Sequence, residues 1–194
     1  MLNEMIACPA EHKFCRLFIA IAFPEKIQQE VHILQQFIRT QNYMHMMMSC
    51  FDHLHATLLF LGEVAKQDVT PIHDILEKEK RKEIFAEWSG RVDLFYRNKN
   101  PSAIVVPIFS GDLERFLIKL RDSLSFLRTI DMRPFHLHAT LARIKRCFEL
   151  EKLQLFLKTI PQHQYVFPVR VIYLKESVHI NGQLKHIIRA TYEL

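Results

Sequence analysis

A six-residue repeat constrains this 194-residue chain more than any other feature. The sequence His-Leu-His-Ala-Thr-Leu occurs at residues 53–58 and again at residues 136–141. Each copy lies in a short apolar run that indicates a strand, and a segment with helical periodicity follows each. The repeat therefore predicts two similar lobes, each contributing one central strand.

Side chains alternate across a strand, so each copy of the repeat has a polar and an apolar face. The polar faces consist of His53, His55 and Thr57 in the first copy and of His136, His138 and Thr140 in the second. The leucines and alanines can pack in a core, whereas the histidine and threonine faces do not suit ordinary core packing. If the two lobes pack about a pseudo-twofold axis, the polar faces meet across a cleft.

The rest of the chain alternates between strand and helix signals. Strands are expected at 15–23, 53–62, 85–97, 102–109, 135–144, 164–180 and 184–193. Helices are expected at 24–39, 70–82, 113–127 and 148–160. The Asn181-Gly182 dipeptide predicts a tight hairpin turn between the last two strands.

Composition suits a globular protein without long linkers, since 49% of residues are hydrophobic and only 4 are glycine. We expect a loose extension at 1–13 and a single domain at 14–194. The four cysteines form no C-x-x-C pair, which favours a reduced, cytoplasmic protein. No apolar run has the ~18 residues of a membrane span. A net charge of +5 permits an anionic partner such as RNA.

Two facing His–Thr strands suit the hydrolysis of a phosphodiester. Imidazole titrates near neutral pH, so one histidine can accept a proton from attacking water while the other protonates the leaving oxygen. The hydroxyls of Thr57 and Thr140 can donate hydrogen bonds to non-bridging oxygens. Arg143 lies three residues beyond Thr140 and can bind the same phosphate with its guanidinium fork.

Two hypotheses of other classes compete with this interpretation. The four histidines of the repeat offer imidazoles to a metal ion, but no H-E-x-x-H motif or aspartate cluster accompanies them, and a metal site leaves the threonines unexplained. A non-catalytic RNA-binding module would fit the basic charge and the 15 phenylalanines. Most of these phenylalanines follow the apolar periodicity, which favours core packing. We therefore expect no metal and no cofactor.

The motifs resemble those of the 2H phosphoesterases, and most closely those of the bacterial and archaeal RNA 2′,3′-cyclic phosphodiesterases, also called 2′-5′ RNA ligases. The resemblance covers about residues 14 to 194. It rests on four segments. Two contain the repeat: the first copy with its continuation Leu-Phe-Leu-Gly-Glu63, and the second copy with Pro134-Phe before it and Ala-Arg143 after it. The other two are Arg16-Leu-Phe-Ile-Ala-Ile near the start and Val171-Ile-Tyr-Leu-Lys-Glu-Ser177 near the end.

This resemblance implies an α+β, bilobal 2H phosphoesterase fold: two pseudo-twofold-related lobes, with antiparallel sheets facing a central cleft and helices outside. It implies hydrolysis of RNA 2′,3′-cyclic phosphate ends, such as those of tRNA fragments, to 2′-phosphomonoesters, with ligation as the reverse reaction, by a monomer. His55 would protonate the 3′-oxygen, His138 would activate water, and Thr57, Thr140 and Arg143 would bind the phosphate.

Some positions depart from the family pattern. His53 stands where asparagine is usual, His136 stands where arginine is frequent, and residues 44–48 replace a segment that often holds an aromatic residue and prolines. Other 2H enzymes act on 2′,5′-oligoadenylate or on nucleotide cyclic phosphates with the same catalytic pair. The motifs leave these alternative substrates open, and the flanking match favours the RNA end.

Overall fold

The computed structural model describes residues 13–49, 54–79 and 83–194. Its strands are β1 (Phe14–Ile21), β2 (Met44–Met48), β3 (Ala56–Ala65), β4 (Ile84–Trp88), β5 (Asp93–Arg97), β6 (Asn100–Phe109), β7 (His138–Cys147), β8 (Tyr165–Val169), β9 (Val171–Ile180) and β10 (Gln183–Glu193). Its helices are α1 (Glu25–Arg39), α2 (Lys66–Lys78), α3 (Gly111–Ser123) and α4 (Leu150–Thr159). These elements confirm the predicted α+β class.

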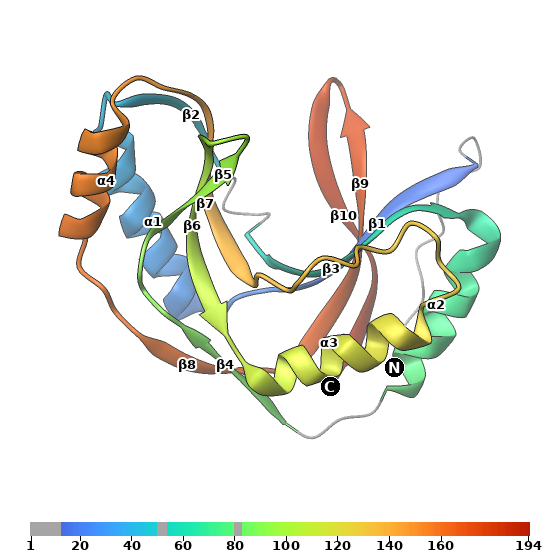
Figure 1. The fold of residues 1–194 in the computed structure, drawn as a ribbon. Coiled ribbons are helices and arrows are strands. Elements are labelled where there is room, and N and C mark those ends of the chain that lie inside the picture. Colours follow the sequence, from blue (N-terminus) through green and yellow to red (C-terminus); the bar gives the residue numbers. More distant parts are fainter. Residues whose placement is uncertain (1–12, 50–53, 80–82) are drawn as a thin grey trace.

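The strands form one antiparallel sheet that divides into two half-sheets (Figure 1). The first half-sheet has the order β10-β9-β1-β3. The second has the order β7-β6-β4-β8, with β2 also beside β7 and β5 beside β6. The half-sheets meet between β3 and β7, where Ala56 and Ala139 form the one registered pair within the described residues. The two copies of the repeat are therefore neighbours at the centre of the sheet.

The helices pack on the outer sides of the half-sheets, as Figure 1 shows for α1 and α4 beside the second and α2 beside the first. Helix α1 follows the predicted periodicity, since Ile27, Val31, Leu34 and Ile38 are buried. The predicted start of α2 at residue 70 was late, because the helix begins directly after β3 at Lys66 and contains Pro71. In the described ranges, no helix is both long and apolar enough to cross a membrane.

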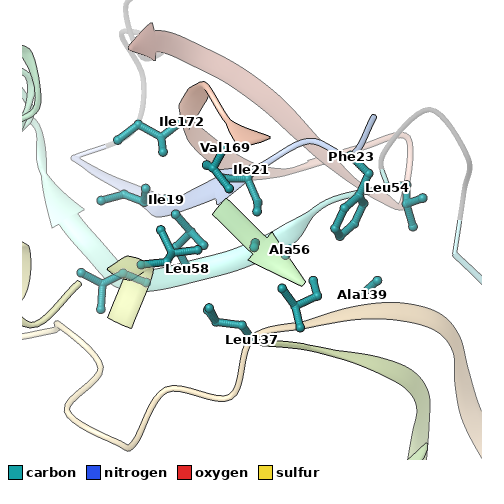
Figure 2. Close-up of a cluster of buried hydrophobic side chains, with 14 of the residues drawn as sticks. Ile19, Ile21, Phe23, Leu54, Ala56, Leu58, Leu137, Ala139, Val169 and Ile172 are labelled. Atoms are coloured by element: carbon teal, nitrogen blue, oxygen red, sulfur yellow. The ribbon is translucent and has the colours of Figure 1, made fainter. Parts of the chain in front are cut away.

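The apolar face of each repeat lies in the hydrophobic core (Figure 2). Leu54, Ala56 and Leu58 of the first copy are buried, and Leu137 and Ala139 of the second are buried beside them. Strands β1 and β9 add further buried side chains to this cluster, including Ile19, Ile21 and Ile172. The predicted division of the repeat into an apolar and a polar face is thus present in the fold.

The strand expected at 85–97 is in fact two strands. Strand β4 pairs with β8 and with the end of β6, whereas β5 forms a hairpin with β6. The chain turns at Gly90, where φ is +67° and a Cβ atom would lie 2.4 Å from the carbonyl oxygen of His163. Only glycine tolerates that conformation at such a close approach, so this residue divides the strand.

The strand expected at 164–180 is also divided, at Arg170: β8 pairs with β4 in the second half-sheet, and β9 pairs with β1 in the first. The predicted hairpin between β9 and β10 is confirmed, with φ of 52° at Asn181 and 75° at Gly182. Strand β2 was missed, since no strand was expected from its methionine-rich sequence. It pairs along β7 instead.

The predicted loose extension at 1–13 lies, except for Lys13, outside the described residues, and it stays a prediction. His53 and Cys50 are outside them as well.

Candidate active site

The pairing of Ala56 with Ala139 gives the site its symmetry. These alanines are the fourth residues of the two copies of the repeat, and they face each other in antiparallel strands. A local twofold axis therefore passes between them. Both alanines are fully buried, so the residues before and after each alanine project from the opposite face of the sheet.

That opposite face brings the predicted histidines and threonines together. Ala56–Ala139 is the pair that the structure registers here; an antiparallel ladder extended by one residue on each side of it would set His55 opposite Thr140 and Thr57 opposite His138. In that ladder His55 and His138 would be diagonal neighbours, with Cα atoms on the order of 8 Å apart. All four side chains are half-buried. The structure thus unites two segments that are far apart in the sequence.

The ring of His138 is held in one tautomer. Its Nδ1 atom lies 2.5 Å from the carbonyl oxygen of His136. A carbonyl oxygen only accepts, so Nδ1 carries the hydrogen, and in the neutral ring Nε2 keeps its lone pair. The backbone, and not the side chain, of the exposed His136 therefore orients this histidine.

The surroundings of His138 favour its neutral form. Burial lowers the pKa of His138 below its ordinary value of 6.5; the hydrogen bond to the carbonyl oxygen of His136 opposes this shift, and the positive charges of Arg143 and His136 add to it. The ring of Phe95, from β5, packs across that of His138 at 4.4 Å between centroids. A neutral imidazole with a free Nε2 lone pair is what a general base requires near pH 7.

A β-bulge brings Arg143 to the same face as Thr140. Val105 of β6 pairs with Thr140 and Ala103 pairs with Arg143, so β7 contains one extra residue between these pairs. Strict alternation would place Thr140 and Arg143 on opposite faces, and the extra residue, Leu141, reverses the parity. Arg143 is exposed beyond Thr140, where its guanidinium can bind an anion held at the threonine.

His55 has an aromatic environment that sequence reasoning missed. Its ring lies 5.2 Å from that of Phe18 on β1 and 5.2 Å from that of His186 on β10. Phe18 and His186 also contact each other at 5.1 Å. Ser177 lies across the hairpin, with its Oγ atom 3.2 Å from Nδ1 of His186. The first histidine is therefore packed between a phenylalanine and a third histidine.

Lys175 is a second residue that sequence reasoning did not single out. It pairs with Phe18 across β1 and β9, so it shares the face on which Phe18 contacts His55. Its side chain is buried, with 7% exposure, and this burial lowers the pKa of its ammonium group. Because a buried charge is costly, an anion bound on this face would favour the protonated lysine.

The hydroxyls of Thr57 and Thr140 are available to a ligand. Both side chains are half-buried, and neither has a hydrogen-bond partner within residues 13–49, 54–79 and 83–194. Over the same ranges, no group of three His, Cys, Asp or Glu side chains is arranged to hold a metal ion. A cavity of about 480 Å³ lies along β1, β9 and β10 in the first half-sheet, and its lining includes Arg16, Glu63 and Ser177.

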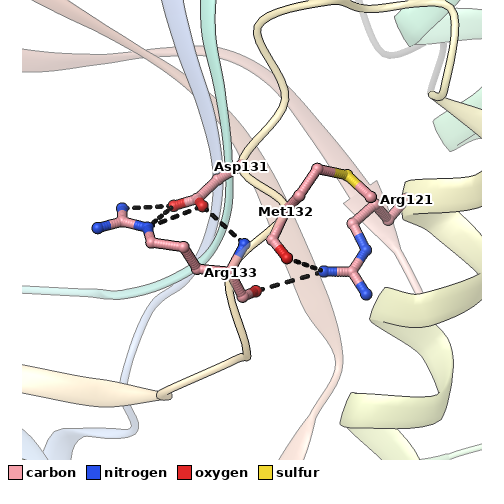
Figure 3. A network of polar contacts seen from close by, with 4 residues as sticks. All are labelled: Arg121, Asp131, Met132 and Arg133. Atoms are coloured by element: carbon pink, nitrogen blue, oxygen red, sulfur yellow. Dashed lines mark hydrogen bonds and ion pairs between the residues drawn. The ribbon is translucent and has the colours of Figure 1, made fainter.

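Polar contacts fix the segment that leads into the second repeat (Figure 3). Arg121 of α3 donates to the carbonyl oxygens of Met132 and Arg133, at 3.4 and 3.3 Å. Asp131 accepts from the side chain and backbone of Arg133, and the backbone N–H of Asp131 donates to Phe60 of β3 at 3.0 Å. These bonds connect the approach to His138 with the strand that follows His55.

Comparison with solved structures identifies the fold. The chain superposes on TT0787 of Thermus thermophilus with a TM-score of 0.76 at 22% identity, covering 92% of this chain and 97% of that one. It superposes on E. coli LigT complexed with 3′-AMP with a TM-score of 0.68 at 22% identity, covering 93% and 98%. The values for a protein described as a phosphoesterase are 0.66 and 21%, covering 93% and 98%.

No protein-family model and no curated relative matches the sequence. At these identities the superpositions show the fold alone, and that fold is shared along almost the whole of both chains. The α+β fold with a large antiparallel sheet, expected from the resemblance, is thereby confirmed.

Proposed function

We propose that this chain is a 2H phosphodiesterase that hydrolyses RNA 2′,3′-cyclic phosphate ends to 2′-phosphomonoesters. One observation supports this most strongly: the two His-x-Thr segments pair about a local twofold axis, with one imidazole held as a base. The shared fold with LigT, which has been crystallised with 3′-AMP, and with a phosphoesterase agrees with this proposal.

Each residue of the site has a role in the proposed reaction. Nε2 of His138 removes a proton from water as the water oxygen forms a bond to phosphorus. The bond between phosphorus and the 3′-oxygen breaks, and protonated His55 gives its proton to that oxygen. Proton transfer from a positioned imidazole is general acid–base catalysis, and it leaves the phosphate on the 2′-oxygen. The same steps with an RNA 5′-hydroxyl in place of water would form a 2′-5′ phosphodiester: His138 removes the hydroxyl proton, the bond between phosphorus and the 3′-oxygen breaks, and His55 protonates that oxygen.

Thr57, Thr140 and Arg143 would stabilise the charge that develops on the non-bridging oxygens. Donors fixed before the reaction stabilise the transition state without a cost of reorganisation. Arg143 supplies a bidentate fork that a phosphate group matches. The same machinery would also serve a 2H enzyme acting on 2′,5′-oligoadenylate or on a nucleotide cyclic phosphate. A non-catalytic RNA-binding module is less favoured, because stacking and charge need no imidazole held as a base.

We expect turnover in the presence of EDTA, because both proton transfers are assigned to imidazoles. The test is incubation with a short RNA ending in a 2′,3′-cyclic phosphate and identification of the product by phosphorus NMR. A 2′-phosphomonoester formed at an undiminished rate in EDTA is the expected result. Activity that EDTA abolishes, and that zinc or manganese restores, would refute the assignment of these proton transfers.

The pH dependence of kcat/KM should be bell-shaped, with its acidic limb below pH 6.5. That limb reports the pKa of the base in the free enzyme, and burial lowers the pKa of His138 below 6.5. Replacing Arg143 by Met should move the limb to higher pH, since its positive charge helps to lower this pKa. A rate that rises steadily to high pH would contradict the two-histidine assignment.

A further inference from the structure

A second bulge in β7 extends the polar face beyond Arg143. Met47 of β2 pairs with Arg143 and His45 pairs with Arg146, with a register shift between these pairs. Arg146 therefore projects from the same face as Arg143. Because His45 and Met47 are two residues apart in β2, their partners Arg146 and Arg143 are roughly 7 Å apart. His45 and Arg146 are exposed, and Met47 is 55% exposed, which places this row on the surface.

Positive charge predominates on this side of the site, where Asp93 at the start of β5 is paired with Arg91 and Glu149, next to Phe148, is paired with Lys152. No acidic residue occurs in the sequence from 94 to 109 or from 138 to 148. Arg97 and Lys99, at the β5–β6 turn, are exposed and add positive charge. The cavity of the first half-sheet is instead lined by both signs of charge, with Glu63 and Glu176 beside Arg16 and Arg189. A polyanion that reaches the phosphate site would therefore be drawn toward the second half-sheet.

An aromatic platform lies at the end of the arginine row. Phe148 is 48% exposed and directly follows β7. The guanidinium of Arg146 lies over its ring at 5.4 Å, and the His45 ring meets it edge-on at 5.1 Å. Alternating cations and aromatic rings characterise surfaces that bind single-stranded nucleic acid, where cations contact the backbone and rings stack on bases.

We infer that Arg143, Arg146, His45 and Phe148 form a track for the RNA strand on the 5′ side of the cyclic phosphate. This inference rests on the proposed function and extends it, because it makes an oligonucleotide, and not a mononucleotide, the preferred substrate. Arg143 binds the reacting phosphate, Arg146 contacts the backbone next to it, and Phe148 stacks on a preceding base.

The test compares adenosine 2′,3′-cyclic phosphate with a tetraadenylate that ends in the same cyclic nucleotide. The wild-type protein should show a higher kcat/KM on the tetranucleotide, by roughly 5- to 150-fold, which is the range expected for one stacked base. Arg146→Ala and Phe148→Ala should each remove much of this preference through KM. Both should leave turnover of the mononucleotide unchanged, because neither residue contacts the reacting groups.

Salt separates the two contributions. Arg146→Ala should reduce the slope of log kcat/KM against log salt by about 0.7, as expected for one contact to a single-stranded phosphate, and Phe148→Ala should not change it. Arg115→Ala, on the exposed face of α3, removes the same charge elsewhere and should have no effect. The track would be refuted, and the proposed function left intact, by equal kcat/KM values for the two substrates. Equal losses of kcat/KM on both substrates in Arg146→Ala would have the same meaning. Turnover of neither substrate would defeat the proposed function and the track with it.

Discussion

Replacing His138 by alanine should lower kcat on an RNA cyclic phosphate by roughly 10²–10⁴-fold, the contribution of one positioned general base. Replacing His55 by alanine should cause a loss of similar size, through the missing acid. The fold should survive both changes, because these side chains are half-buried on the polar face and not part of the core. Circular dichroism and thermal unfolding of each variant provide the control for folding.

The two losses should differ in their chemistry. A better leaving group at the 3′ position needs less protonation, so an activated aryl phosphodiester should rescue His55→Ala. It should not rescue His138→Ala, in which water still lacks a base. Thr57→Ala and Thr140→Ala should show smaller losses that the leaving group does not change. Equal rescue of both histidine variants would refute the assignment of acid and base, although not the pairing itself.

Replacing Arg189 by methionine should destabilise the protein by about 3–5 kcal/mol, because it removes the positive charge and the hydrogen bonds that the guanidinium gives to the buried carboxylate of Glu176. Arg189 and Glu176 are 5% and 4% exposed, and Nε of the arginine donates to the carboxylate at 2.7 Å. This pair joins β9 and β10, the hairpin that also holds Ser177 and His186 beside His55.

Urea unfolding measures this effect, and an exposed ion pair provides the matched control. Arg115 and Asp112 on α3 have side chains that are 73% and 61% exposed. Arg115→Met should therefore change the free energy of unfolding by at most about 1 kcal/mol. If Arg189→Met were no more destabilising than Arg115→Met, the buried pair would not be what fixes the hairpin.

Patterns that are local in the sequence were sufficient to predict the centre of the fold. The repeat identifies its own polar face, and the apolar periodicity locates α1 and the central strands. The Asn181-Gly182 dipeptide predicts more than the turn itself, because a two-residue turn also fixes the register of the two strands of its hairpin. That register sets Ser177 opposite His186, so this contact could have been predicted from the sequence.

Features that depend on contacts between distant segments could not be predicted in this way. The bulge after Thr140 brings Arg143 to the phosphate side, and no residue of β7 indicates it, because it arises from pairing with β6. Strand β2 lacks a strand-like alternation, since methionines occupy both its faces, and it is defined by its pairing with β7. The contacts of His55 with Phe18 and of His138 with Phe95 likewise join separate parts of the chain.

The double variant His55→Ala/His138→Ala tests most directly whether the two histidines act as one catalytic unit. The measurement is single-turnover hydrolysis of an RNA cyclic phosphate by the wild type, both single variants and the double variant. Residues that act in one concerted step give losses far from additive, so the double variant should lose little more than the worse single variant. Losses that multiply, or wild-type activity in either single variant, would contradict the account.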